Sequence, residues 1–311
     1  MRYRIAAIIP HGLLVKEFRL APQDGAPLPP WRPGAHVELS FRARDGVHHT
    51  NAYSIVGEAE NTLRIAVQRE ERGHGGSRAL HDEFAVGMEL RLGLPMDSFR
   101  LNVGARRTVL IGGGIGITPM LSMARTLQAL RAPWELHYLV RDATRLVLAD
   151  DLCALDGSHA HIYLTEADGR PDIGRIIGPW RGGSELHACG PQVLMDAVRN
   201  CAATLGWPAQ HIHFESFGAR LQAHDMPLRV HLRQTGMTLD VAPGTSILDA
   251  MIDAEVLVSY ECKRGECGNC YAGVLSGEPV HRDICLSPQQ RAQGMTPCVS
   301  WCRGTELELD L

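Results

Sequence analysis

The chain has 311 residues, enough for two or three domains, and its composition of 45% hydrophobic and 21% charged residues is that of an ordinary globular protein. A formal net charge of −4 and the lack of a basic run argue against nucleic-acid binding. Residues 1–18 hold only a short apolar run, broken by Pro10 and His11, so we expect a cytoplasmic protein with no membrane segment and no signal peptide.

Short alternating strands separated by turns dominate residues 1–101 and predict a small antiparallel β-barrel. The clearest strands cover 34–39 and 62–68. A second feature of this region is Gly75-Gly76-Ser77, which precedes a predicted helix over 78–84. Glycines at such a helix start can hold a phosphate through backbone amides, and the serine adds a hydroxyl.

A strand, a glycine turn and a helix follow one another from residue 108 onward. The predicted strand 108–111 leads into Gly-Gly-Gly-Ile-Gly, and a helix is predicted over 120–130. Thr118 suits the N-cap of this helix and Pro119 its first turn. This arrangement is how α/β folds present backbone amides to a pyrophosphate.

Further alternation of strands and helices predicts a doubly wound parallel sheet. The expected elements are strands 134–140, 161–165, 185–189 and 211–217, and a helix over 192–205. Ligands bind beyond the carboxyl ends of such strands, where Thr118, Cys189 and Phe217 fall. Arg141 and Asp142 also follow a strand; aspartate suits a ribose 2′-hydroxyl and arginine a 2′-phosphate, while a solvated turn pair is the alternative.

Four cysteines near the C-terminus give the strongest signal. Cys262, Cys267 and Cys270 have the spacing C-x4-C-x2-C, and Cys298 follows, which is the plant-type pattern for a [2Fe–2S] cluster. Structural zinc prefers paired C-x2–4-C knuckles, and nine cysteines without a signal peptide do not fit a disulfide framework. Rivals of Cys298 as the fourth ligand are Cys285 and Cys302.

Histidines in alternating pairs, at 159 and 161 and at 211 and 213, are best interpreted as surface residues, because no carboxylate or cysteine stands near them in a suggestive pattern. His48 and His49 precede Asn51-Ala-Tyr-Ser; the default interpretation is a pair of loop histidines, and the alternative is a role in supporting that segment. The net charge is confined to one end: residues 228–311 hold seven Lys and Arg against eleven Asp and Glu, whereas residues 1–227 hold 24 of each.

The order of these features resembles the phthalate dioxygenase reductase family, which includes the vanillate demethylase reductases. The resemblance is carried by the glycine turn, Cys-Gly-Pro at 189–191, Phe-Glu-Ser-Phe at 214–217 and the cysteine spacing, and it covers essentially the whole chain. It implies a multidomain protein. The expected parts are an antiparallel β-barrel that binds FMN (1–101), a doubly wound α/β domain that binds NADH (102–221), a linker (222–227) and an α+β, β-grasp-like ferredoxin domain (228–311).

The resemblance implies roles for particular residues. Tyr53 and Ser54 would lie against the flavin ring, and Phe217 would stack near it. Ser54, Cys189 and Phe217 are therefore the candidates for lining the hydride-transfer site. The family has an arginine where this chain has Asn51, so we expect Arg78 or another cation to balance the FMN phosphate.

The expected cofactor contacts fall into two groups. The flavin group is Asn51, Ala52, Tyr53, Ser54, Ala66, Gly75, Gly76, Ser77 and Arg78. The nucleotide group is Gly112, Gly113, Gly114, Gly116, Thr118, Pro119, Arg141, Asp142, Cys189, Gly190 and Pro191.

The implied function is that of a monomeric reductase, which passes electrons from NADH through FMN and a [2Fe–2S] cluster to a separate Rieske-type oxygenase. The chain has no C-x-H…C-x-x-H Rieske motif of its own. Two further functions remain open: a free-standing NADH reductase for quinones, ferric chelates or an electron carrier, and a redox sensor. Between NADH and NADPH, the family's preference favours NADH.

Overall fold

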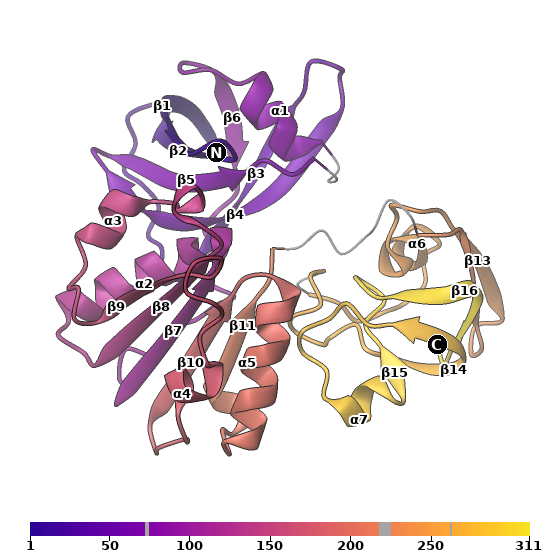
Figure 1. The fold of residues 1–311 in the computed structure, drawn as a ribbon. Coiled ribbons are helices and arrows are strands. Elements are labelled where there is room, and N and C mark those ends of the chain that lie inside the picture. Colours follow the sequence, from indigo (N-terminus) through magenta and orange to yellow (C-terminus); the bar gives the residue numbers. More distant parts are fainter. Residues whose placement is uncertain (72–74, 218–224, 262) are drawn as a thin grey trace. The chain divides into compact units, whose positions relative to one another are not determined.

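The computed structural model describes residues 1–71, 75–217, 225–261 and 263–311. Its contacts divide the chain into two compact units, Met1–Phe217 and Gly218–Leu311 (Figure 1). The first unit holds a barrel and a parallel sheet, and the second holds a mixed sheet. The domain boundary at 101/102 and the linker at 222–227 stay predictions, and residues 222–224 lie outside the described part of the chain.

The barrel closes in the strand order β1-β2-β5-β4-β3-β6, with antiparallel pairing throughout. Its strands are β1 (Arg2–His11), β2 (Val15–Pro22), β3 (His36–Arg42), β4 (His48–Ala59), β5 (Thr62–Gln68) and β6 (Glu89–Leu92). Alternation places Phe18, Leu20, Ile55 and Ile65 in its core. The predicted antiparallel barrel is confirmed.

Helix α1 (Gly76–Asp82) follows β5 and begins two residues before the predicted start at 78. Gly75 precedes it as N-cap with φ +90°, a left-handed conformation that glycine adopts without steric cost. The glycine therefore turns the chain into the helix earlier than the pattern of apolar residues suggests.

The parallel sheet has the strand order β11-β10-β7-β8-β9. Its strands are β7 (Arg107–Gly113), β8 (Trp134–Val140), β9 (Ala160–Leu164), β10 (Ser184–Cys189) and β11 (Ile212–Glu215), and its helices are α2 (Ile117–Ala129), α3 (Ala149–Cys153), α4 (Ile173–Ile177) and α5 (Gln192–Thr204). Helix α2 packs its apolar side on Leu110, Leu136 and Tyr138. The doubly wound arrangement is as predicted.

The start of α2 corrects a sequence prediction. The glycine turn itself winds into a 3-10 turn over Gly114–Gly116, and α2 then begins at Ile117 with Gly116 as N-cap. Thr118 is thus inside the helix and does not cap it. Its hydroxyl donates to the carbonyl of Ile115 at 3.0 Å, because the helical backbone already surrounds it.

The second unit has the strand order β13-β12-β16-β14-β15, in which β12 and β16 run parallel and the other pairs antiparallel. The elements are β12 (Leu228–Leu232), β13 (Met237–Val241), α6 (Ile247–Asp253), β14 (Ala272–Val280), α7 (Pro288–Arg291), β15 (Gly294–Met295) and β16 (Trp301–Leu309). Met251 of α6 packs on this sheet, whose core includes Val230 and Leu307. This is the predicted α+β, β-grasp-like fold.

No helix in the described residues is both long and apolar enough to span a membrane.

Candidate functional site

The carboxyl end of the parallel sheet meets strand β4 of the barrel. In the sheet register Cys189 lies between Gly112 and Glu215 on the neighbouring strands. The Ser54 hydroxyl donates to Glu215 Oε2 at 3.4 Å, and both side chains are buried, at 3% and 1% exposure. The structure therefore brings Ser54 and Cys189, two predicted site residues, to the same end of the sheet.

Glu215 is a residue that sequence reasoning missed. It stands at the end of a predicted strand, in the segment Phe-Glu-Ser-Phe. Because ligands bind beyond the carboxyl ends of such strands, an acidic residue at this position was the signal that could have identified it. Phe217 follows two residues later and is 39% exposed. Its aromatic ring is therefore accessible to a cofactor at the edge of the first unit.

Gly75 and Gly76, at the start of α1, lie close to β4. Asn51 and Tyr53 lie on one half-buried face of this strand. A Cβ added to Gly76 would collide with Asn51 Oδ1, and one added to Gly75 would lie 3.6 Å from both Arg78 Nη2 and His49 Cε1. The Asn51 contact requires glycine at position 76 and the left-handed backbone favours it at 75, and the exposed Arg78 lies beside them where the sequence predicts a phosphate.

The Tyr53 hydroxyl offers a direct test of whether FMN fits here. It is buried and has no hydrogen-bond partner among the described residues, and burial raises the pKa of the phenol. A buried tyrosine hydroxyl normally finds a partner, so the arrangement fits a bound group with polar atoms. Ser77 accepts a hydrogen bond from the Glu70 amide at 3.0 Å and keeps its own proton to donate.

Two other predicted flavin residues lie apart from this cradle. Ala52 is exposed on the opposite face of β4 from Asn51 and Tyr53. Ala66 on β5 is buried in the cluster that α2 forms with the barrel. Neither side chain is among those that lie near the Cβ positions of Gly75 and Gly76.

The glycine turn and the Cys-Gly-Pro turn pack against each other. A Cβ on Gly113 would lie 2.9 Å from Pro191 Cδ, and one on Gly116 would collide with the Cys189 carbonyl oxygen. Gly114, in contrast, has φ +55° and open space around its Cβ position. Its backbone is therefore accessible to a ligand, whereas Thr118 and Pro119 are buried beneath it.

Arg141 and Asp142 are both engaged locally. The Asp142 carboxylate accepts from the Thr144 amide at 2.9 Å, and the Thr144 hydroxyl hydrogen bond lowers its pKa. Arg141 lies 3.6 Å from Glu166 at the surface. These partners are those of a solvated turn, so the pair gives no preference between NADH and NADPH.

Two of the predicted cluster ligands come together in the second unit. Cys270 and Cys298 are 3% and 5% exposed, and the Cys298 thiol hydrogen bond lowers the pKa of Cys270 to about 7. Cys267 is exposed on the same loop and accepts from the Asn269 amide at 3.5 Å. Gly265 and Gly268 have φ +66° and +76°, the left-handed turns that a loop around a cluster requires.

The rivals of Cys298 have other surroundings. The Cys302 thiol is buried in the sheet core and donates to the carbonyl of Glu306 at 3.3 Å. Cys285 Sγ lies 3.7 Å from the Cβ position of Gly268, beside the loop. Cys262 lies outside the described residues, and within them no three His, Cys, Asp or Glu side chains form a complete metal site. Ligation by all four cysteines therefore stays a prediction.

The histidines at 211 and 213, interpreted from the sequence as surface residues, are partly buried and pair with a carboxylate. Both contact the Glu185 carboxylate, at 3.1 Å and 2.9 Å, because β10 and β11 pair in parallel register. His187 stacks on His213 with centroids 4.5 Å apart, and burial lowers the pKa of His187 to about 4. The carboxylate is 26 residues away from His211, so only the fold reveals it.

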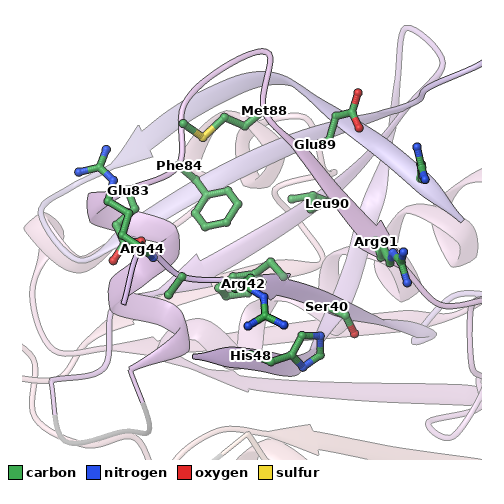
Figure 2. A pocket seen from close by; sticks show the side chains of 13 residues that line it. Ser40, Arg42, Arg44, His48, Glu83, Phe84, Met88, Glu89, Leu90 and Arg91 are labelled. Carbon is green, nitrogen blue, oxygen red and sulfur yellow. Dashed lines mark hydrogen bonds between the residues drawn. The ribbon is translucent and has the colours of Figure 1, made fainter. Parts of the chain in front are cut away.

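A separate cavity of about 700 Å³ lies on the barrel between β3, β6 and the end of α1 (Figure 2). Phe84 and Leu90 form part of its apolar wall, and Arg42 and Arg91 are among four arginines around it. Its lining includes none of the predicted cofactor residues, so it is distinct from the site at the sheet end.

Comparison with known proteins identifies the family. The chain is 36% identical to the phthalate dioxygenase reductase of Burkholderia cepacia over 302 residues, which cover 94% of this chain and 92% of the relative. The chain belongs to the phthalate dioxygenase reductase family. It is also 34% identical, over 96% of its length and 94% of the relative's, to tetrachlorobenzoquinone reductase of Sphingobium chlorophenolicum.

Structure and domain comparisons agree with this membership. The solved structure of phthalate dioxygenase reductase, described as modular and as transferring electrons from pyridine nucleotides to [2Fe–2S], matches with a TM-score of 0.75 and 34% identity over 100% of this chain and 98% of that one. Residues 230–303 match the 2Fe-2S iron-sulfur cluster binding domain. The prediction of an oxidoreductase is confirmed, and so is that of an iron–sulfur domain of the [2Fe–2S] type.

Proposed function

We propose that this reductase transfers electrons from NADH through FMN and the [2Fe–2S] cluster to a separate terminal oxygenase of the Rieske type. The observation that carries the proposal is the Ser54–Glu215 contact beside Cys189. It brings the predicted flavin strand to the nucleotide end of the sheet, in a chain that also contains the iron–sulfur domain.

Different residues of the first unit have separate roles in binding the flavin and the nucleotide. Tyr53 would pack against the flavin ring, and Gly75, Gly76 and Arg78 would hold its phosphate. The open backbone at Gly114 receives the nucleotide pyrophosphate. When bound, FMN would supply the chemistry that converts a hydride from NADH into single electrons for the cluster.

The buried end of the sheet excludes water from the transfer. Ser54, Cys189 and Glu215 are all nearly inaccessible and come from three different strands, so they would keep water from one side of a bound nicotinamide. The Ser54 hydroxyl donates to Glu215, which keeps the carboxylate hydrogen-bonded and fixes the direction of the serine. Phe217 covers the outer edge.

The second unit supplies the exit for electrons. Cys262, Cys267, Cys270 and Cys298 hold the cluster, and the surrounding loop carries Leu257 at 98% exposure and Tyr260 at 46%. The acidic excess of residues 228–311 supports an encounter that depends on complementary charge. Lys263, Arg264 and Glu266 lie on this loop and are candidates for partner recognition.

A second candidate is a free-standing NADH reductase that acts on a quinone. The similarity to tetrachlorobenzoquinone reductase favours a quinone over a ferric chelate or an electron carrier as the acceptor, since that relative is matched along nearly its whole length. In this case the acceptor would take electrons without an oxygenase.

The decisive experiment has two stages. Anaerobic stopped-flow mixing with NADH, and separately with NADPH, should show loss of flavin absorbance followed by loss of cluster absorbance, and faster reduction by NADH. Steady-state assays then compare product formation by an added Rieske oxygenase with direct quinone reduction. A chain that reduces quinones efficiently and supports no oxygenase turnover would favour the second candidate. A cluster that stays oxidised would contradict both.

A further inference from the structure

A buried network of charges joins the barrel to the parallel sheet. Its centre is Arg64 on β5, which is 8% exposed. Its guanidinium donates to both oxygens of Glu17 at 2.7 and 3.0 Å, and to both oxygens of Asp151 at 2.9 and 2.8 Å. Glu17 and Asp151 are themselves only 1% and 9% exposed.

The partners of Arg64 come from different parts of the first unit. Glu17 is on barrel strand β2, whereas Asp151 is on α3, beside the parallel sheet. Arg125 of α2 also pairs with Asp151. The four charges therefore link two barrel strands to two helices of the nucleotide part, and they sum to zero.

Arg125 extends the network to the strand that carries Ser54. Its Nη1 donates to the carbonyl of Val56 at 3.1 Å. Val56 lies in a β-bulge, where the pairing of β4 with β5 shifts between Ile55 and Gly57. A bulge interrupts the ladder and leaves backbone groups for other partners, and here the partner is a side chain of α2.

Glycine at position 57 leaves room for Arg125 at the bulge. A Cβ on Gly57 would lie 2.9 Å from Arg125 Nη1. Gly57 also stands opposite Arg64 in the β4–β5 register, so the two arginines contact the same short segment from different sides. Since Val56 is two residues after Ser54, and α2 starts at the glycine turn, these contacts connect the flavin strand to the nucleotide turn.

The electrostatics show how strongly the network is coupled. Burial alone would raise the pKa of Glu17, but hydrogen bonds from His11 and Arg64 hold it well below its ordinary value. Burial and the Arg64 charge lower the pKa of Arg125. Arg19 also reaches Glu17, at 3.1 Å from the half-exposed rim. Buried ion pairs contribute little net stability, and their best-attested role is to fix one geometry.

We propose that Arg64 is a positioning residue for hydride transfer, which holds the flavin strand and the nucleotide helix at a fixed separation through Glu17, Asp151 and Arg125. The inference rests on the proposed reduction of FMN by NADH. It adds a structural requirement for hydride transfer that is met by residues outside the hydride-transfer site. Hydride transfer depends steeply on the distance between the reacting atoms, and a misplacement of about 1 Å can cost roughly 100-fold in rate.

The test compares Arg64→Lys and Arg64→Met with a matched control. Lysine keeps the charge but cannot bond two carboxylates in a bidentate manner, and methionine removes the charge. The control is Arg107→Met, because Arg107 pairs with Glu135 at 3.3 Å within the parallel sheet and does not reach the barrel. Each variant is purified with FMN, and its FMN content and melting temperature are recorded.

The readout is anaerobic single-turnover reduction of the flavin at several NADH concentrations, with NADH and with its 4-deuterated form. We expect Arg64→Lys to lower the limiting reduction rate about tenfold or more and to raise the deuterium isotope effect, with the apparent Kd for NADH and the FMN content unchanged. Arg107→Met should lower the melting temperature and leave the limiting rate within about twofold of the parent.

A parent-like limiting rate in Arg64→Lys, with only a lower melting temperature, would overturn the proposal and leave the network a purely structural one. If Arg64→Met does not fold, Arg64→Lys still decides. A parent protein whose flavin is not reduced by NADH would count against the proposed function itself, which separates that failure from failure of the inference.

Discussion

Ser54 and Glu215 lie 161 residues apart in the sequence, yet the Ser54 hydroxyl donates to the Glu215 carboxylate at 3.4 Å in a buried environment. One residue is on a barrel strand and the other ends a strand of the parallel sheet. Their contact marks the place where the flavin and nucleotide halves of the first unit meet.

Replacing Ser54 should slow flavin reduction more than it weakens nucleotide binding. Ser54→Ala removes the donor to a buried carboxylate and a polar group from the transfer site, so we expect the limiting reduction rate to fall roughly tenfold or more. Stopped-flow mixing with NADH measures it. Ser40→Ala is the control, because the Ser40 hydroxyl bonds to that of Thr50 at the surface of the barrel. Equal rates in both variants would remove Ser54 from the site.

Cysteine variants should separate the fourth cluster ligand from its rivals. Cys298→Ser is expected to lose the cluster's visible absorbance and most of its iron, since Cys298 lies against Cys270. Cys302→Ser and Cys285→Ser should keep both, because the Cys302 thiol serves backbone carbonyls in the core and serine can replace that hydrogen bond. Iron analysis and the visible spectrum decide. Cluster loss in Cys302→Ser alone would mean that the ligand assignment is wrong.

The close packing of the glycine turn against the Cys-Gly-Pro turn predicts that an added methyl group at Gly116 destabilises the first unit. Gly116→Ala would place a methyl group against the Cys189 carbonyl oxygen and should destabilise the first unit by about 1–3 kcal/mol. It should also weaken NADH binding, because the turn must move. Gly182→Ala is the matched control, since nothing lies within 4 Å of its Cβ position. Urea unfolding of the two variants gives the comparison, and indistinguishable midpoints would contradict the prediction.

Buried histidines predict a loss of stability in acid. Burial lowers the pKa of His187 to about 4, so between about pH 6.5 and pH 4 the unfolded chain binds a proton that the folded chain does not. Stability therefore rises with pH across this window and falls as the pH drops through it. His137 shows the same direction for the same cause, also to about 4, and should contribute in parallel.

The effect of His187 can be isolated by substitution. His187→Phe should flatten part of the pH dependence of the melting temperature between pH 4 and 6.5, with the rest due to His137. His48→Ala, at an exposed position, should leave the dependence as it is in the parent. An unchanged slope in His187→Phe would show that this histidine is not kept neutral by burial.

Local patterns explain why much of the fold and part of the site were predictable. The three cysteines of the C-x4-C-x2-C segment and the glycine turn are local patterns whose chemistry follows from neighbouring residues, whereas the roles of Tyr53 and Ser54 were implied by the family resemblance. The prediction of Thr118 as the N-cap was wrong because the glycine turn already winds into a 3-10 turn over Gly114–Gly116, which no capping rule anticipates. The contact of Glu215 with Ser54 and the ion pairs around Arg64 form only when the barrel packs on the sheet. Arg64 is 47 residues from Glu17 and 87 from Asp151, and nothing local indicates either pairing.

The bulge in β4 also affects where the chain can be divided into parts that fold separately. Ile55 belongs to the barrel core and Val56, the next residue, to the core that α2 forms with the sheet. One strand thus supplies two interiors, and a fragment of residues 1–101 would expose Val56 and leave Arg64 with only one of its two carboxylates. We therefore expect domain exchange between relatives to succeed when the first and second units are recombined whole, and to give insoluble protein when the cut is made between barrel and sheet.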